Sequence, residues 1–257
     1  MYFIAKNDVN ATCRKAILQS EPEQAFGQGL HYNETMSKIT VFLAIFAIVS
    51  VTHVVSIFLR KEKLRQISKI FVIPPLLAAY IASGAGETLF FPIPALVFGW
   101  IGDMLLLRIV RKNWFKLGLV SFLLGHLCYI ITFTRFLGFF GADGSLNVTA
   151  LLVSVPLALV LGIASFRFIK PSREMAFPVI IYTTFLLSIN LLALQVLIFN
   201  PDSAGVLVFL GCLFFLVSDI ILAYYTFRKL KLPGAALIMI FYITAQAGII
   251  LGLIYIV

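Results

Sequence analysis

Two aspartates lie within long apolar segments of the chain, and their carboxyl groups are the side chains best suited to chemistry. Asp103 falls in VFGWIGDMLLL and Asp219 in LFFLVSDIILA. An acidic side chain at the centre of a membrane-spanning helix costs roughly 2.5 to 3.5 kcal/mol at least, so its presence indicates a functional site. Two aspartates in such similar settings predict one shared site, suited to moving protons in catalysis or in a relay.

The elements that must position these aspartates are membrane spans. The 257 residues are 61% hydrophobic and only 12% charged, and the mean hydropathy is +1.04. A spanning helix needs about 20 mostly apolar residues. Eight segments meet this requirement, at 38–59, 69–84, 92–107, 115–138, 149–166, 176–199, 204–226 and 235–257.

The apolar runs are continuous and are much longer than the tilted strands of a membrane β-barrel. We therefore predict an all-α integral membrane protein, a bundle of eight transmembrane helices. Residues 38–257 are expected to form one membrane domain, and residues 1–37 a polar N-terminal tail.

Basic residues in the connections predict the orientation of the bundle. The first, third, fifth and seventh connections are rich in Lys and Arg. The even-numbered connections have a single basic residue, Arg135, at the edge of the fourth. By the positive-inside rule the odd connections face the cytoplasm, so both termini are predicted to be non-cytoplasmic. The net charge of +9 is then mostly a topology signal. Because these charges are spread over short membrane loops, they argue against nucleic acid as a partner.

Depth along the helices places further polar side chains near the aspartates. At a rise of 1.5 Å per residue, Asp103 and Asp219 lie roughly 7 and 13 Å from the basic cytoplasmic ends of their spans, and His126 lies roughly 15 Å from its own. Tyr129 shares a helix face with His126, because residues three apart are neighbours on a helix. A histidine and a phenol are therefore expected to point together.

Three more polar residues fall inside spans. Tyr242 and Gln246 are four residues apart in the last span, and Asn190 lies near the middle of the sixth. They are suited to lining a polar cavity, but residues of the same types also serve as hydrogen-bonding contacts between helices. Both interpretations stay open for each of them.

Metal ligands are sparse in this sequence. His31 lies in the N-terminal tail, so His53 and His126 cannot build a three-histidine zinc site within the membrane. A mixed site that includes the aspartates remains an alternative. The expectation is no metal and no other cofactor.

Four segments, read in order, carry a resemblance. GWIGDMLLL, FLLGHLCYIITF, FLGCLFFLVSDIILAYYTF and FYITAQAGIILGL resemble the motifs of the YhhN-like membrane family, whose characterised members are lysoplasmalogenases. The segment SKIFVIPPLLAAY resembles the family's Lys-then-Pro entry to a spanning helix, although here the prolines are displaced from the lysine. The resemblance does not extend to residues 1–37.

The resemblance implies an ether hydrolase that acts on a lysophospholipid among the membrane lipids. Such an enzyme cleaves the vinyl ether bond of a lysoplasmalogen, with a choline or ethanolamine head group, and releases a fatty aldehyde and a glycerophospho-alcohol. Asp103 and Asp219 would form the catalytic pair, one protonated at rest and one ionised, in the manner of the two carboxyl groups of glycosidases. Which aspartate is the acid stays unassigned at this point.

The other candidates are assigned two kinds of role under this resemblance. The residues that would position substrate or water are His126, Tyr129, Tyr242, Gln246 and Asn190. The lipid phosphate would be held by Lys69 or Lys116 at the cytoplasmic edge. The host membrane would be the endoplasmic reticulum in a eukaryote and the inner membrane in a bacterium.

Two other classes of function remain as alternatives. A proton-coupled transporter or lipid-binding membrane protein would use the same aspartates as a relay. The spans 92–107 and 204–226 look alike but share one orientation, so they do not provide the inverted repeat of many transporters. A purely structural scaffold would leave both aspartates without a role. Detection of a cleaved product separates the enzyme from a carrier, which moves its lipid unchanged.

Overall fold

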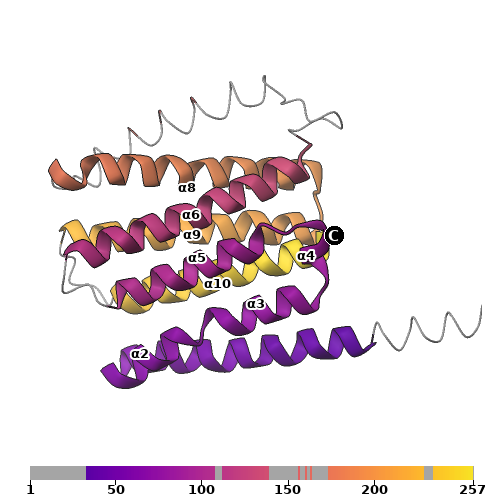
Figure 1. Cartoon of the computed structure of the whole chain (residues 1–257), viewed down its shortest axis with the longest axis horizontal. Helices are drawn as coiled ribbons and strands as arrows, with labels where there is room; N and C mark the ends of the chain where they lie inside the picture. The colour runs from indigo at the N-terminus through magenta and orange to yellow at the C-terminus, as the bar shows by residue number, and fades with distance from the viewer. Residues whose placement is uncertain are drawn as a thin grey trace, which may run out of the picture.

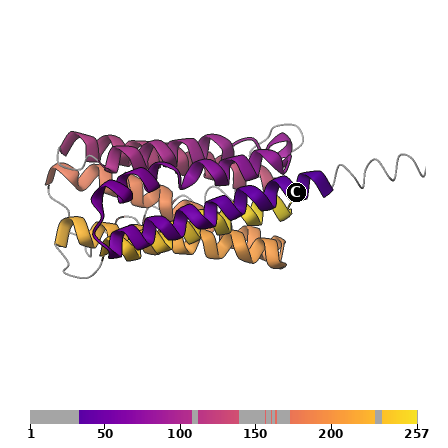
Figure 2. The same cartoon turned by 90° about the horizontal axis from the view of Figure 1, so that it is seen from below.

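The protein is a bundle of long helices that lie side by side (Figure 1). The computed structural model describes residues 33–107, 112–138, 173–228 and 234–256, and between the second and third of these ranges only positions 156, 160 and 163. All regular secondary structure in the described residues is helical, which confirms the predicted all-α class. Seen from below, the helix axes are nearly parallel to one another (Figure 2).

Seven apolar helices correspond to predicted membrane spans. Six of them are long enough to cross a bilayer, namely Asn33–Phe58, Glu62–Ala82, Trp114–Phe136, Arg173–Phe199, Ser203–Phe227 and Gly234–Ile256. The seventh, Pro92–Leu106, is shorter. The helix Asn33–Phe58, called the N-terminal helix below, begins five residues before the predicted start at 38. The predicted span 149–166 lies outside the described residues except for positions 156, 160 and 163, and the orientation of the termini stays a prediction.

The remaining elements follow the N-terminal helix in chain order. They are α2 (Glu62–Ile70), α3 (Ile73–Ala82), α4 (Ala85–Thr88), α5 (Pro92–Leu106), α6 (Lys112–Phe136), α8 (Arg173–Phe199), α9 (Ser203–Arg228) and α10 (Gly234–Ile256).

The second span is divided into α2 and α3 by a proline. Pro74 in the first turn of α3 has no N–H, so it cannot bond the carbonyl of Ile70 as a continuous helix would require. Trp100 of α5 donates its indole Nε1–H to this Ile70 oxygen, at 2.7 Å. A neighbouring helix thus satisfies the carbonyl that the proline leaves free. The same bond ties the end of α2 to α5.

Glycines allow two pairs of helices to pack closely. A Cβ atom at Gly211 of α9 would lie 2.6 Å from the backbone nitrogen of Ile249 in α10, and one at Gly248 would lie 3.1 Å from the Gly211 Cα. Between α5 and α6, a Cβ at Gly125 would lie 3.1 Å from the Ala95 carbonyl oxygen. Small residues permit such approach between helices in lipid. These contacts hold α5, which carries Asp103, to α6, and α9, which carries Asp219, to α10.

The outer face of the bundle is also apolar. Ile48 and Val51 of the N-terminal helix, Phe177 and Ile198 of α8, and Ile220 of α9 are all exposed. A helix that is apolar on every side fits a membrane span, because lipid covers the face that the protein does not.

Candidate active site

Asp103 lies in α5 and is paired with a cation. Its Oδ1 atom is 3.1 Å from Lys69 Nζ at the end of α2, and the side chains of Lys69 and Asp103 are 13% and 4% exposed. The second carboxyl oxygen, Oδ2, is buried and has no hydrogen-bond partner. The structure therefore holds a buried ion pair between α2 and α5, with one carboxyl oxygen still available.

Polar side chains of α6 and α10 continue from Asp103. The Tyr242 hydroxyl is buried beside the Asp103 carboxyl group. One turn further along α10, Gln246 accepts a hydrogen bond at Oε1 from the Tyr129 hydroxyl, at 2.9 Å. Gly99 of α5 lies next to this group, since a Cβ there would be in ordinary contact with Tyr242 Oη at 3.5 Å. Tyr129, Tyr242 and Gln246 are thus brought together on the Asp103 side.

Asp219 lies in α9 and has a different environment. Tyr182 of α8 donates a hydrogen bond from its hydroxyl to Asp219 Oδ2, at 2.5 Å. Asp219 is half-buried, whereas Asp103 is fully buried. No ion pair to Asp219 is found among the described residues. The partner of Asp219 is thus a neutral phenol, whereas the partner of Asp103 is a lysine.

Asp219 and Tyr182 line a cavity of about 320 Å³ between α6, α8 and α9. The other walls are almost entirely apolar, with Thr183 and Thr226 as the further polar residues. Along α9 the lining extends from Leu216 to Phe227 at the end of the helix, with Asp219 between them. Its size and lining suit a hydrocarbon chain placed against one carboxyl group.

Aromatic rings of α6, α8, α9 and α10 form a cluster next to the Tyr182–Asp219 bond. The His126 ring centroid lies 5.0 Å from that of Tyr182 and 5.0 Å from that of Phe215. Tyr242 lies against Phe215 at 5.6 Å and against Phe122 at 6.1 Å. Phe122 also lines the cavity. The rings form a continuous contact from the Tyr182–Asp219 bond to the Tyr242 hydroxyl beside Asp103.

The ring contacts connect Tyr182, which bonds Asp219, to Tyr242 through His126 and Phe215. One site shared by the two aspartates stays a prediction. Among the described residues, no three His, Cys, Asp or Glu side chains are grouped so that they would hold a metal ion.

His126 occupies the centre of the aromatic cluster. The residue is 1% exposed, and both of its ring nitrogens lack a hydrogen-bond partner. It contacts the ring of Tyr182, the residue that binds Asp219, but it bonds neither carboxyl group directly. A buried imidazole with two free nitrogens is well placed to bind a water molecule or a polar substrate atom.

The other candidates from the sequence are Asn190, Lys69 and Lys116. Asn190 donates from Nδ2 to the Leu186 carbonyl of its own helix at 2.8 Å, and its Oδ1 is buried without a partner. Lys69 is engaged by Asp103. Lys116 directly follows Phe115 in the chain. Phe115 and Phe227 both line the cavity.

The sequence reasoning missed Tyr182, the partner of Asp219. The depth argument that selected His126 contains the signal for it. Tyr182 lies nine residues after Arg173 at the start of α8, and Asp219 lies nine residues before Arg228 at the end of α9. Because the two helices pack against each other, equal distances from their basic ends place the phenol and the carboxyl group at one level.

All of these site residues fall within one family match. The model of the YhhN family matches residues 64–253, about three quarters of the chain. The N-terminal helix precedes the matched region. No curated protein and no solved structure matches the chain. On the extent of the family match, the chain belongs to the YhhN family.

Proposed function

We propose that this protein is a lysoplasmalogenase-like hydrolase that cleaves the vinyl ether bond of lysoplasmalogens. The observation that carries the proposal is the contrast between the two aspartates. Asp103 is paired with the Lys69 ammonium group, whereas Asp219 is bonded by the Tyr182 phenol and lines an apolar cavity. Membership of the YhhN family supports a hydrolase of this kind.

The contrast assigns the two roles that acid and base chemistry needs. A nearby cation favours the ionised form of a carboxyl group, and apolar surroundings favour the neutral form. Asp103 is therefore the carboxylate and Asp219 the neutral acid. The Tyr182 hydroxyl holds Oδ2 of Asp219, which leaves the proton on Oδ1 to be donated toward the cavity.

The reaction begins when Asp219 protonates the β-carbon of the vinyl ether. The electron pair of the double bond forms the new C–H bond, and an oxocarbenium cation results. Water adds to the cationic carbon and returns a proton to Asp219, which gives a hemiacetal. The hemiacetal then collapses, its hydroxyl proton passes to the glycerol oxygen, and the C–O bond breaks. The products are a fatty aldehyde and a glycerophospho-alcohol.

The remaining groups stabilise the cation and place the substrate. Asp103 supplies a negative charge in a site that excludes water, where electrostatic stabilisation of a transition state is strong. The faces of Phe122 and Phe215 add attraction for a cation. The apolar cavity takes the hydrocarbon chain, so that the vinyl carbons lie next to Asp219.

The polar residues beside Asp103 have supporting roles in this proposal. His126 binds the attacking water through a free ring nitrogen, and the hydroxyl of Tyr242 faces the glycerol oxygens. Tyr129 orients Gln246 through their hydrogen bond. Asn190 contributes its free Oδ1 to the same polar network. Lys116 is the candidate for the lipid phosphate, because Lys69 is bound to Asp103.

A panel of lysolipids tests the reaction. The purified protein is incubated separately with vinyl ether, alkyl ether and acyl lysophosphatidylethanolamine, and free aldehyde and free fatty acid are measured. We expect aldehyde from the vinyl ether alone, because only a carbon–carbon double bond next to the ether oxygen accepts the proton. Release of fatty acid from the acyl lipid without any aldehyde would overturn the proposed chemistry.

Two variants test the pair of acids. Asp219→Asn cannot donate a proton and Asp103→Asn carries no charge, so each is expected to lose nearly all aldehyde release while the protein remains folded in detergent. Unchanged elution on size exclusion and helical circular dichroism serve as the folding controls. Full activity in either variant would contradict the mechanism.

A further inference from the structure

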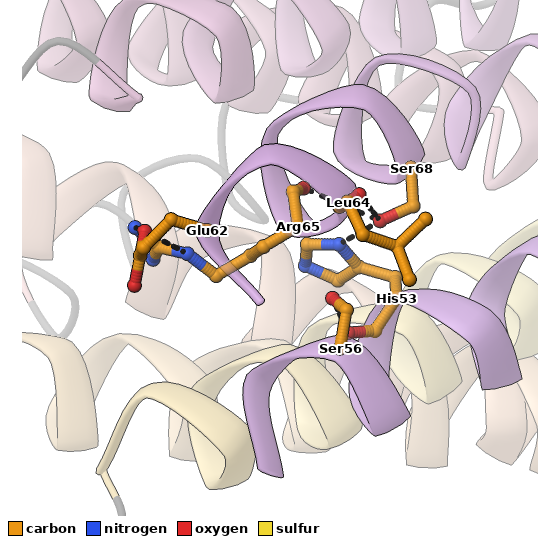
Figure 3. A network of polar contacts seen from close by, with 6 residues as sticks. All are labelled: His53, Ser56, Glu62, Leu64, Arg65 and Ser68. Carbon is orange, nitrogen blue, oxygen red and sulfur yellow. Dashed lines mark hydrogen bonds and ion pairs between the residues drawn. The ribbon is translucent and has the colours of Figure 1, made fainter. Parts of the chain in front are cut away.

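The N-terminal helix, which precedes the family match, contacts α2 through a buried histidine. His53 is 1% exposed, and its Nδ1 atom lies 2.9 Å from the Ser68 hydroxyl oxygen. Figure 3 shows the imidazole ring of His53 directed at Ser68 across the gap between the two helices. A polar contact of this depth in a membrane span needs a purpose, since packing alone is satisfied by apolar residues.

Further hydrogen bonds surround this contact. The Ser68 hydroxyl donates to the Leu64 carbonyl at 2.7 Å. With its proton directed there, its oxygen can accept from an Nδ1–H of His53. The Ser56 hydroxyl donates to the carbonyl of His53 at 2.6 Å. Of these bonds, the one between His53 and Ser68 joins the N-terminal helix to the last turn of α2.

Lys69 lies between two residues that are anchored by other helices. Ser68, just before it, is bound by His53 of the N-terminal helix. Ile70, just after it, has its carbonyl bound by Trp100 of α5 at 2.7 Å. A lysine side chain is long and flexible, so a fixed backbone on both sides restricts where its ammonium group can lie. The result is the 3.1 Å contact with Asp103.

We propose that His53 is a positioning residue for the Lys69–Asp103 pair, and that the N-terminal helix is therefore a functional part of the site. Through Ser68, His53 keeps the end of α2 where Lys69 holds Asp103 in its ionised form. Loss of the His53 bond leaves the pair looser, and Asp103 takes up a proton. The consequence for catalysis rests on the proposed function, but the consequence for the charge of Asp103 does not.

Carbodiimide labelling reads the charge of Asp103 directly. A lipid-soluble carbodiimide adds to protonated carboxyl groups and forms a stable N-acylurea, which is located by mass spectrometry of the peptide that contains Asp103. We expect little adduct on Asp103 in the natural protein. His53→Leu, which has no donor, and Ser68→Ala, which has no acceptor, should each raise the labelled fraction several-fold.

Three variants provide matched comparisons. His53→Asn retains an N–H donor at the position of Nδ1, so its labelling should stay near that of the natural protein. Lys69→Met removes the cation and should give the strongest labelling. Thr52→Val alters a neighbouring hydroxyl that bonds the carbonyl of Ile48 in its own helix, and should change nothing. Each variant is first shown to elute and melt as a folded protein.

The outcomes separate this inference from the proposed function. Folded His53→Leu and Ser68→Ala proteins with Asp103 unlabelled would overturn it, as would strong labelling of Asp103 in the natural protein or none in Lys69→Met. If aldehyde is released, His53→Leu should lower kcat roughly 10-fold or more with KM little changed, because His53 does not line the cavity. A rise in KM alone would also overturn the inference. If no aldehyde is released, the proposed function fails, and the labelling still decides the role of His53.

Discussion

Lys69 Nζ and Asp103 Oδ1 are 3.1 Å apart, and they join α2 to α5 beneath the surface of the bundle. Each charge has lost nearly all contact with solvent, so each depends on the other. In a membrane this dependence is strong, because an unpaired ion has no inexpensive alternative environment. The pair thus links the stability of α2 to the state of a carboxyl group in the candidate active site.

Lys69→Met should lower the free energy of unfolding by about 3 to 5 kcal/mol, because the buried Asp103 carboxyl group loses the cation that stabilises its charge and must take up a proton to avoid a buried unpaired ion. The double variant Lys69→Met with Asp103→Asn should recover much of this loss, since neither charge remains. Unfolding in a series of detergent mixtures measures both effects. The residues do not interact if the double variant loses as much free energy of unfolding as the two single variants lose together.

Tyr182→Phe should lower kcat by about 10-fold or more, because the Asp219 carboxyl group would no longer be oriented by the phenol. Its free energy of unfolding should fall by only about 0.5 to 1.5 kcal/mol, the usual net contribution of one hydrogen bond. Aldehyde release and thermal unfolding are the two measurements.

A matched control for this variant is Tyr80→Phe. The Tyr80 hydroxyl donates to the Leu89 carbonyl at 2.7 Å, and Tyr80 does not line the cavity. It should lose a similar amount of stability without a change in kcat. Equal losses of activity in both variants would argue that Tyr182 acts only through the fold.

Ala223→Phe should shorten the hydrocarbon chain that the protein accepts. Ala223 lines the cavity, and a phenyl group there would occupy part of its volume of about 320 Å³. We expect KM to rise for long-chain substrates and to change less for short-chain ones. Val206→Phe places the same ring on an exposed position of α9 and should leave chain preference unchanged. An unaltered chain-length profile in Ala223→Phe would place the chain elsewhere.

Gly211→Ala should destabilise the bundle, because the added Cβ would lie 2.6 Å from the backbone nitrogen of Ile249, which cannot move alone. Gly99→Ala provides the comparison. Its Cβ would lie 3.5 Å from Tyr242 Oη, an ordinary contact, so the fold should tolerate it. Melting temperatures of the two variants in detergent test the difference. Equal melting temperatures would indicate that α9 and α10 can separate without cost.

The sequence predicts the helices well because an apolar run of spanning length has few other interpretations. It also places Asp103, Asp219 and His126 at neighbouring depths, since rise per residue and loop charge are enough to determine depth. In the structure His126 lies against the rings of Tyr182, the partner of Asp219, and Phe215, and the shared site stays a prediction. The family resemblance drawn from four motifs is confirmed by the match to residues 64–253.

The sequence does not reveal which partner each acid has. A lysine near the end of a span serves equally well for topology, for a lipid phosphate or for an ion pair, and only the packing of α2 on α5 shows that Lys69 contacts Asp103. The Tyr182 bond to Asp219 likewise depends on how α8 and α9 face each other. Helical periodicity gives depth and face within one helix, but the facing of two helices comes from packing.

The bond from Trp100 to the Ile70 carbonyl has a consequence for how this sequence can change over evolution. The indole is needed at that carbonyl because position 74 is a proline and supplies no N–H. A relative without this proline would close the backbone bond itself and would be free to lose the tryptophan. Aligned relatives should therefore show covariation between the positions of Pro74 and Trp100, although the two belong to different helices.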